Sequence, residues 1–215
     1  MRHGRISDMN TYGLKPGDII GFSGRNWLSA GINVATYGIP LWSVSHVGIV
    51  AEVKVGGRLL LFESTTLNGD WPCLITGKKI CGTQAHSAEF IVGQYQGGAW
   101  HYPFYRRLYM HERVRLNRFL LDSIGTEYDV KGALRAGGLA FAVLEALFRE
   151  QSAQTLFCSE WVAAAHQTIG TLQTANFSRW SPNHLCRYMR RMGLLYKPKR
   201  LPVLPDHEQY ERFAV

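Results

Sequence analysis

The first half of the chain alternates short apolar runs with turn-forming residues, a pattern typical of β-strands. Residues 14–22 (LKPGDIIGF) predict a turn that opens a short buried strand. Two apolar runs, Val44 to Val53 and Arg58 to Ser64, flank Gly56-Gly57 and predict a β-hairpin. This hairpin is the clearest β signal in the sequence.

The segments around the hairpin are less regular. Residues 25–37 place apolar side chains at helical spacing and predict a short helix. Residues 68–87 contain Gly, Pro, Asp and Asn with few regularly spaced apolar positions, which predicts a long loop. Residues 88–110 alternate well enough to predict one or two further strands.

From residue 113 onward, apolar residues recur every three to four positions, which is the period of a helix. Arg113 to Ile124 predict a helix closed by Gly125, and Val130 to Arg149 predict a second helix with a largely apolar second half. Cys158 to Ile169 predict a third helix that begins at Cys158. Ser181-Pro182 predicts the start of a fourth helix, with proline at its first position.

Strands followed by helices indicate a single α+β domain, and 215 residues are enough to bury a core. We expect this domain to cover residues 1–196, and residues 197–215, which contain three prolines, to run extended over the surface. The 46% hydrophobic and 19% charged fractions are ordinary for a globular protein.

The formal net charge of +8 broadens the range of expected partners. A basic surface attracts nucleic acid, anionic lipid or an acidic polymer, although it also serves solubility alone. The N-terminal residues lead into polar sequence without an apolar signal region, and the longest apolar stretch, Gly137 to Phe148, is shorter than the ~20 residues of a membrane span. We therefore expect a cytoplasmic protein, or one released to the cell envelope without a signal peptide.

The four cysteines stand at positions 73, 81, 158 and 186, and no two of them form a C-x-x-C pair. Their irregular spacing favours free thiols in a reducing compartment over a disulfide framework. No cluster of His, Cys and Asp has the spacing of metal ligands, so we expect no metal and no cofactor.

Cys158 differs from the other cysteines because it is predicted at the start of a helix. The helix dipole and unpaired N–H groups at such a position favour the thiolate, and the same N–H groups can hold an oxyanion. The alternative is an inert core cysteine, which is the interpretation we give to Cys73, Cys81 and Cys186.

His46 and Glu63 are the candidate partners of a cysteine nucleophile. His46 stands among β-branched residues of a predicted strand, which would hold a general base rigidly, although a structural histidine bonded to a carbonyl has the same pattern. Glu63 is a carboxylate inside an apolar strand. A two-residue turn at Gly56-Gly57 would set Val50 opposite Glu63, four residues and ~13 Å from His46 along the strand. Direct contact then requires a shifted register, a bulge or a longer loop.

The other seven histidines fall in predicted loops or on polar helix faces, where we expect solvated roles. They are His3, His86, His101, His111, His166, His184 and His207.

Taken together, these segments resemble the circularly permuted papain-like hydrolases of the NlpC-type superfamily, in the YiiX/YebB-like branch. The resemblance covers residues 14 to about 185 and rests on motifs in the family's order: LKPGDII at 14–20, SHVGIV at 45–50, LFES at 61–64, GTEYD at 125–129, FCSEWV at 157–162, and Ser181-Pro182.

The resemblance implies an antiparallel sheet packed against helices. It implies His46 as base, Glu63 as its orienting group and Cys158 as nucleophile. We assign substrate binding to Tyr128 and Trp161, which lie within two of the matched motifs.

The resulting prediction is a cysteine hydrolase that cleaves an amide bond, a peptidase or amidase acting for instance on the peptides of peptidoglycan. One alternative is a lipid acyl hydrolase or acyltransferase that works at a membrane surface. Another is a non-catalytic module that keeps the fold as a structural or nucleic-acid-associated component of a larger assembly such as a virion. The reactivity of the Cys158 thiol distinguishes the two enzymes from the non-catalytic module, and the choice of substrate distinguishes the two enzymes from each other.

Overall fold

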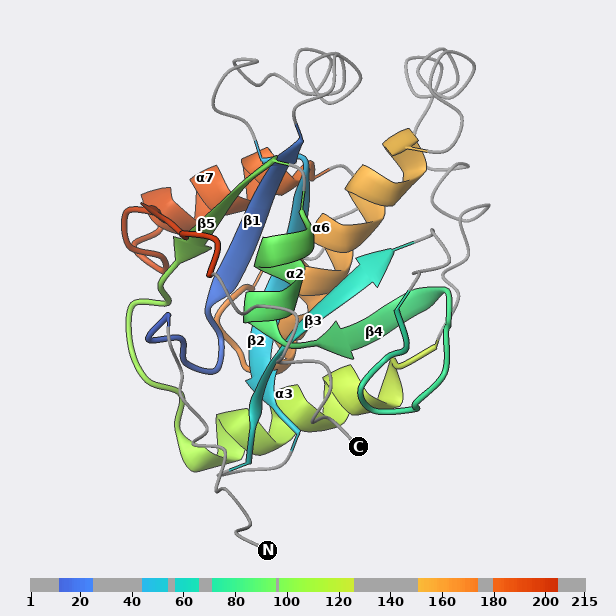
Figure 1. Cartoon of the computed structure of the whole chain (residues 1–215). Helices are drawn as coiled ribbons and strands as arrows, with labels where there is room; N and C mark the ends of the chain where they lie inside the picture. Colours follow the sequence, from blue (N-terminus) through green and yellow to red (C-terminus); the bar gives the residue numbers. More distant parts are fainter. Residues whose placement is uncertain are drawn as a thin grey trace, which may run out of the picture.

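The computed structural model describes residues 12–24, 44–53, 57–65, 71–95, 97–125, 151–173 and 180–204. The helices predicted at 25–37 and 130–149 lie outside these ranges. Six strands of the described part form one antiparallel sheet in the order β4-β3-β2-β1-β5-β6 (Figure 1). Their bounds are Ile19–Gly24 (β1), His46–Glu52 (β2), Leu59–Thr65 (β3), Gly82–His86 (β4), Gly97–Tyr102 (β5) and Lys199–Arg200 (β6).

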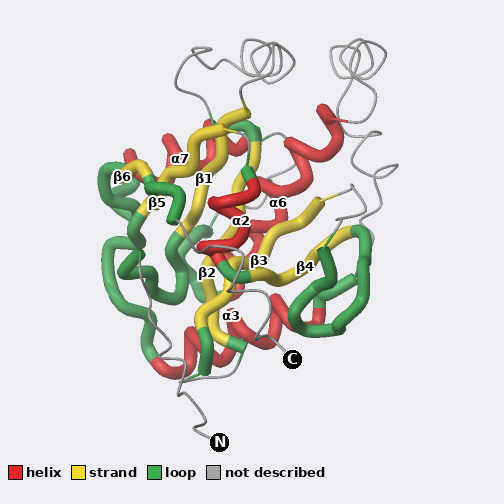
Figure 2. The backbone as a smooth tube through the Cα atoms, in the orientation of Figure 1, coloured by secondary structure: helices red, strands yellow, loops and turns green. Residues whose placement is uncertain are grey.

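Four described helices pack on the two faces of this sheet (Figures 1 and 2). Helix α2 (Ala88–Gln94) lies on one face, over a small apolar cluster that includes Phe22, Val50 and Leu61. The helices α3 (Met110–Asp122), α6 (Gln151–Thr168) and α7 (Pro182–Arg191) cover the other face. The larger core lies there. This arrangement confirms the predicted α+β class.

The predicted hairpin is present as β2 and β3, but its register differs from the expected one. Gly48, and not Val50, lies opposite Glu63. The Val53 amide donates to the Arg58 carbonyl at 3.1 Å, so four residues, 54–57, connect the strands in place of two. The whole of β3 is therefore shifted by two positions relative to β2, which leaves each side chain on its predicted face.

The segment 82–94 contains the main errors of the sequence prediction. Residues 82–86, expected in a loop, form β4 beside β3, and all five are buried. Residues 88–94, expected in a strand, form α2, because the Ser87 side chain accepts a hydrogen bond from the Phe90 amide and caps the helix. Only β5 confirms the strand prediction for residues 88–110.

The predicted helix ends are confirmed more often than the starts. Gly125 and Gly170 follow α3 and α6 with positive φ angles of 69° and 75°, as expected for glycines after a helix. Ser181 caps α7 by accepting from the His184 amide, with Pro182 at the first position. Helix α3 begins three residues earlier than predicted, at Met110.

Residues 199–200 pair with β5 as the edge strand β6. The extended segment that we expected to run over the surface therefore adds a strand to the sheet. Among the described helices, none is long and apolar enough to cross a membrane.

Candidate active site

Three secondary structure elements carry the three predicted catalytic residues. His46 is the first residue of β2, Glu63 lies within β3, and Cys158 lies on α6. Helix α6 packs against both β2 and β3. Because His46 stands at the end of its strand, its ring can reach both the neighbouring strand and the helix that covers the sheet.

The His46 ring is hydrogen-bonded to Glu63, with 2.9 Å between His46 Nε2 and Glu63 Oε2. In the observed register His46 is two residues from the position opposite Glu63, and such a diagonal neighbour is within reach of a long side chain. Gly48, which lies directly opposite Glu63, has no side chain to block this contact. The four-residue connection between β2 and β3 therefore produces the contact that a two-residue turn would have prevented.

Glu63 is held as a carboxylate although it is only 7% exposed. Burial alone would raise the pKa of Glu63, but the hydrogen bond with His46 and the nearby His86 ring outweigh it and lower the pKa to about 2. His86 Nδ1 lies 3.8 Å from the second carboxylate oxygen, Oε1. The carboxylate is thus negative at neutral pH and lies between two imidazole rings.

Cys158 lies close enough to His46 to change its protonation. Burial by itself would lower the pKa of His46, but the charge of Cys158 and hydrogen bonds with Cys158 and Glu63 raise it well above its ordinary value. The His46 side chain is 19% exposed, whereas Cys158 is completely buried. The raised pKa means that His46 holds a proton readily, with the Glu63 carboxylate on one side and Cys158 on the other.

The prediction that Cys158 begins a helix is wrong. Helix α6 begins at Gln151, seven residues earlier, so Cys158 lies in the interior of the helix. Residues 151–157 contain no glycine or proline and continue the helix without a break. Backbone N–H groups in a helix interior bond to carbonyls one turn earlier, so the amides around Cys158 are not the unpaired donors that we expected for an oxyanion.

Of the two predicted substrate-binding residues, the structure describes Trp161, which lies in the core. Trp161 is buried to 7% exposure, its Nε1–H donates to Ser123 Oγ at 3.3 Å, and its ring packs near that of Phe119. These contacts join α6 to α3 and indicate a core role. Tyr128 lies outside the described residues.

The other three cysteines are not joined in disulfides in the structure. Cys73 is buried and accepts a hydrogen bond from the Ala85 amide, and Cys186 is buried on α7. Burial, together with the nearby charge of Cys158, raises the pKa of the Cys186 thiol far above its ordinary value. Cys186 is therefore an uncharged core residue near the candidate nucleophile.

Three of the histidines that we expected in solvated positions are in fact buried. His86 lies in β4 and His166 in α6, and His101 in β5 bonds through Nε2 to Asp18 Oδ2 at 2.7 Å. Asp18 also accepts from the Phe104 amide, so this pair ties β1 to β5 and to the segment after it. The error follows from the loop prediction at 68–87 and from placing His166 on a polar helix face.

His86 is the residue of the site that sequence reasoning missed. It lies on the same sheet face as Glu63, because Leu61, two residues before Glu63, is its partner in the register. Its Nε2–H donates to the Pro72 carbonyl at 3.2 Å, which fixes the ring beside the carboxylate. Recognition of residues 82–86 as a strand would have placed His86 there.

The described residues contain no group of three or more His, Cys, Asp or Glu side chains arranged to hold a metal ion. The candidate site consists of the His46 imidazole, the Glu63 carboxylate and the Cys158 thiol.

Comparison with solved structures gives a likeness at low sequence identity. No protein-family model matches the sequence, and no curated protein matches it. The crystal structure of yiiX from Escherichia coli O157:H7, described as a metalloprotein, shares 16% sequence identity with this chain at a TM-score of 0.47. The alignment covers 87% of this chain and 89% of that one.

Proposed function

We propose that this chain is a cysteine hydrolase that cleaves an amide bond, with Cys158 as nucleophile, His46 as general base and Glu63 as the group that orients His46. The observation that carries the proposal is the chain of contacts from Glu63 through His46 to Cys158. A carboxylate, an imidazole and a thiol in this order are what nucleophilic catalysis by cysteine requires.

In the proposed reaction, His46 takes the proton of the Cys158 thiol, and the thiolate attacks the carbonyl carbon of the substrate. The tetrahedral intermediate collapses, His46 gives its proton to the leaving amine, and an acyl-enzyme remains. Water, deprotonated by His46, then releases the carboxylic acid and regenerates the thiol. Glu63 stabilises the imidazolium that forms in both halves of the reaction.

The proposed substrate class is a peptide with acidic groups, such as the stem peptide of peptidoglycan. The net charge of +8 favours association with an anionic polymer. The same charge favours an anionic lipid surface, which is the setting of the lipid acyl hydrolase that we consider as the alternative. A third alternative, a non-catalytic component of a virion-like assembly, predicts an intact fold without turnover.

The test compares wild-type protein with Cys158→Ala and, as a matched control, Cys186→Ala, which removes a second buried thiol. The substrates are peptidoglycan fragments with a free stem peptide and vesicles of phosphatidylcholine that contain phosphatidic acid. We expect wild type and Cys186→Ala to release amine from the peptide, and Cys158→Ala to lose at least ~10²-fold of this rate. Release of fatty acid alone supports the lipid alternative. Equal activity of the Cys158→Ala variant, or no turnover by wild type, would reject cysteine catalysis.

A further inference from the structure

A cavity separate from the candidate active site lies at the opposite end of β2 from His46. A cavity of about 230 Å³ opens where the segment before β1 meets the segment before α3. Its apolar wall consists of Leu14, Pro16 and Leu108. Its charged lining consists of Lys15, Glu52, Arg107 and Arg113.

The lining of this cavity contains more cationic side chains than carboxylates, because Glu52 is the single carboxylate among its lining residues. Glu52 is engaged by Arg113, whose Nε donates to Oε2 at 3.1 Å and whose Nη2 donates to Oε1. The charges of Arg113 and Glu52 therefore cancel each other. The Lys15 and Arg107 side chains therefore leave the cavity with a net positive charge.

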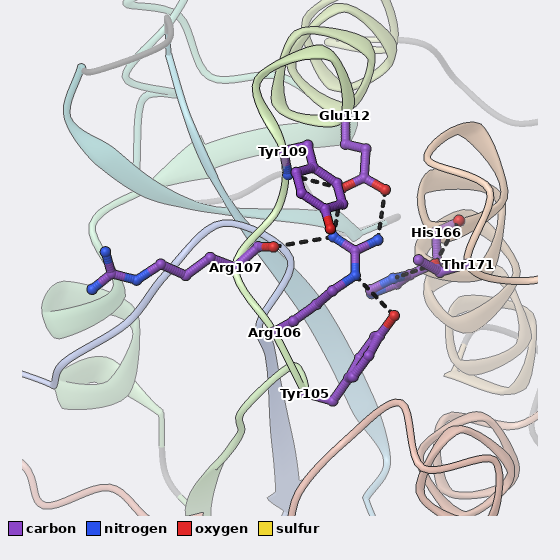
Figure 3. Close-up of polar contacts among 7 residues, drawn as sticks. All are labelled: Tyr105, Arg106, Arg107, Tyr109, Glu112, His166 and Thr171. Carbon is purple, nitrogen blue, oxygen red and sulfur yellow. Dashed lines mark hydrogen bonds and ion pairs between the residues drawn. The ribbon is translucent and has the colours of Figure 1, made fainter.

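The Arg107 side chain extends away from the other acidic group nearby. Figure 3 shows Arg106 facing Glu112, with its guanidinium bonded to both carboxylate oxygens at 2.6 Å, and Arg107 pointing in a different direction. The Arg107 carbonyl accepts a bond from Arg106, which fixes the backbone at this point. Arg107 is exposed, so its guanidinium can approach a ligand in the cavity.

We propose that this cavity binds a phosphate-type anion, either a small phosphate monoester or the phosphate of a lipid headgroup. A guanidinium and an ammonium group in its lining can form the charge-assisted bonds that phosphate oxygens accept. The volume is below the ~300 Å³ at which sites for drug-sized ligands begin, so it suits a single compact anionic group. The apolar wall suits the carbon chain that carries this group.

The anion site is separate from the Cys158 site. Glu52 is the last residue of β2 and His46 is the first, so about 20 Å of strand separates them. Binding at the cavity therefore adds a second function to the chain and does not depend on the hydrolase.

A lipid headgroup is one of the two proposed sources of the phosphate, because exposed apolar side chains closely follow the lining residue Arg107 in the sequence. Tyr109 and Met110 follow Arg107 and are 63% and 60% exposed. Val114, one helical turn after Met110, is 51% exposed. Side chains of this kind can contact acyl chains while Lys15 and Arg107 hold a headgroup.

The experiment measures binding of the full chain to two kinds of probe. Calorimetric titrations use inorganic phosphate and glycerol phosphate, and co-sedimentation uses phosphatidylcholine vesicles with and without phosphatidic acid. The variants are Lys15→Ala and Arg107→Ala. The control is Arg118→Ala, which removes a cation that is 85% exposed on α3 and outside the cavity.

We expect Lys15→Ala and Arg107→Ala to weaken binding by roughly 10-fold or more, and Arg118→Ala to change it less than about twofold. Binding of soluble phosphate with this pattern assigns a phosphate or phosphate-ester site. Binding only to phosphatidic acid vesicles, with the same pattern, assigns the headgroup as the source. Absence of binding to both probes, or an equal loss in all three variants, overturns the proposal.

Discussion

The Glu63 carboxylate lies 2.9 Å from the His46 ring although the two residues are not directly paired across the sheet. Gly48 is the residue opposite Glu63, and its missing side chain leaves room for the diagonal contact. The contact arises from the four-residue connection between β2 and β3.

Glu63→Gln keeps an acceptor at this position but removes its charge. The pKa of His46 is expected to fall, because the hydrogen bond and charge of Glu63 are among the causes that raise it. An NMR titration of the His46 ring measures this shift, and kcat/KM for amide release is expected to fall by about 10²–10⁴-fold. Glu52→Gln, on the same hairpin but at the far end of β2, serves as the control. An unchanged His46 titration in Glu63→Gln would contradict the assigned role.

Gly48→Ala is expected to lower the free energy of unfolding by about 1–3 kcal/mol. A Cβ at this position would lie 2.8 Å from the Phe62 carbonyl oxygen and 2.7 Å from Leu61 Cδ1. The side chain of Leu61 can move, but the backbone of β3 must shift to relieve the first contact, and Glu63 shifts with it. Urea unfolding measures the loss of stability. A variant as stable as wild type would show that the two strands approach each other less closely at Gly48.

His86→Gln is expected to raise the pKa of Glu63, because the His86 ring, 3.8 Å from the carboxylate, is one cause of its low value. Glu63 has a folded pKa of about 2 and an ordinary value of 4.5, so its ionisation stabilises the fold above pH 4.5, and this contribution is lost as the pH falls toward 2. Each unit of upward shift removes about 1.4 kcal/mol of this contribution.

The free energy of unfolding, measured between pH 2 and 7, tests the effect of His86→Gln. The difference from wild type is expected to be largest above pH 4.5 and to shrink as the pH approaches 2. His184→Gln, at an exposed position on α7, is the control and is expected to show no such trend. A difference that is constant over the whole pH range would contradict the coupling to Glu63.

Arg106→Ala is expected to destabilise the fold by about 1.5–3 kcal/mol, because it leaves the buried Glu112 carboxylate without its two bonds from the guanidinium (Figure 3). Those bonds are the main cause that lowers the pKa of Glu112. Arg118→Ala breaks an exposed pair with Asp122 on the same helix and is expected to change stability by less than about 0.5 kcal/mol. Equal effects of the two substitutions in urea unfolding would contradict this account.

Much of the fold was predictable because apolar residues recur at regular spacing over long segments. The β2–β3 hairpin and the helices α3 and α6 follow from such periods, and α7 follows from the start signal at Ser181-Pro182. Strand β4 and helix α2 were not predictable in this way, because β4 buries polar residues such as Gln84 and His86, and α2 depends on a single cap at Ser87.

The predicted triad residues lie together in the structure, but two structural details that join them were not accessible from the sequence. The register of His46 and Glu63 depends on whether two or four residues form the connection around Gly56-Gly57, and a glycine pair fits both. The start of α6 has no strong cap signal, so the apolar face at 158–169 predicted a helix that begins too late.

The most direct test of the central claim is the rate at which iodoacetamide modifies Cys158 at neutral pH, followed by mass spectrometry of the digested chain. The thiolate is the reacting form, so an imidazolium at His46 should make Cys158 react faster than the same residue in the urea-unfolded chain, while Cys186 reacts more slowly. His46→Ala should remove this advantage. A Cys158 rate in the folded wild type no higher than in the unfolded chain would contradict the proposed nucleophile.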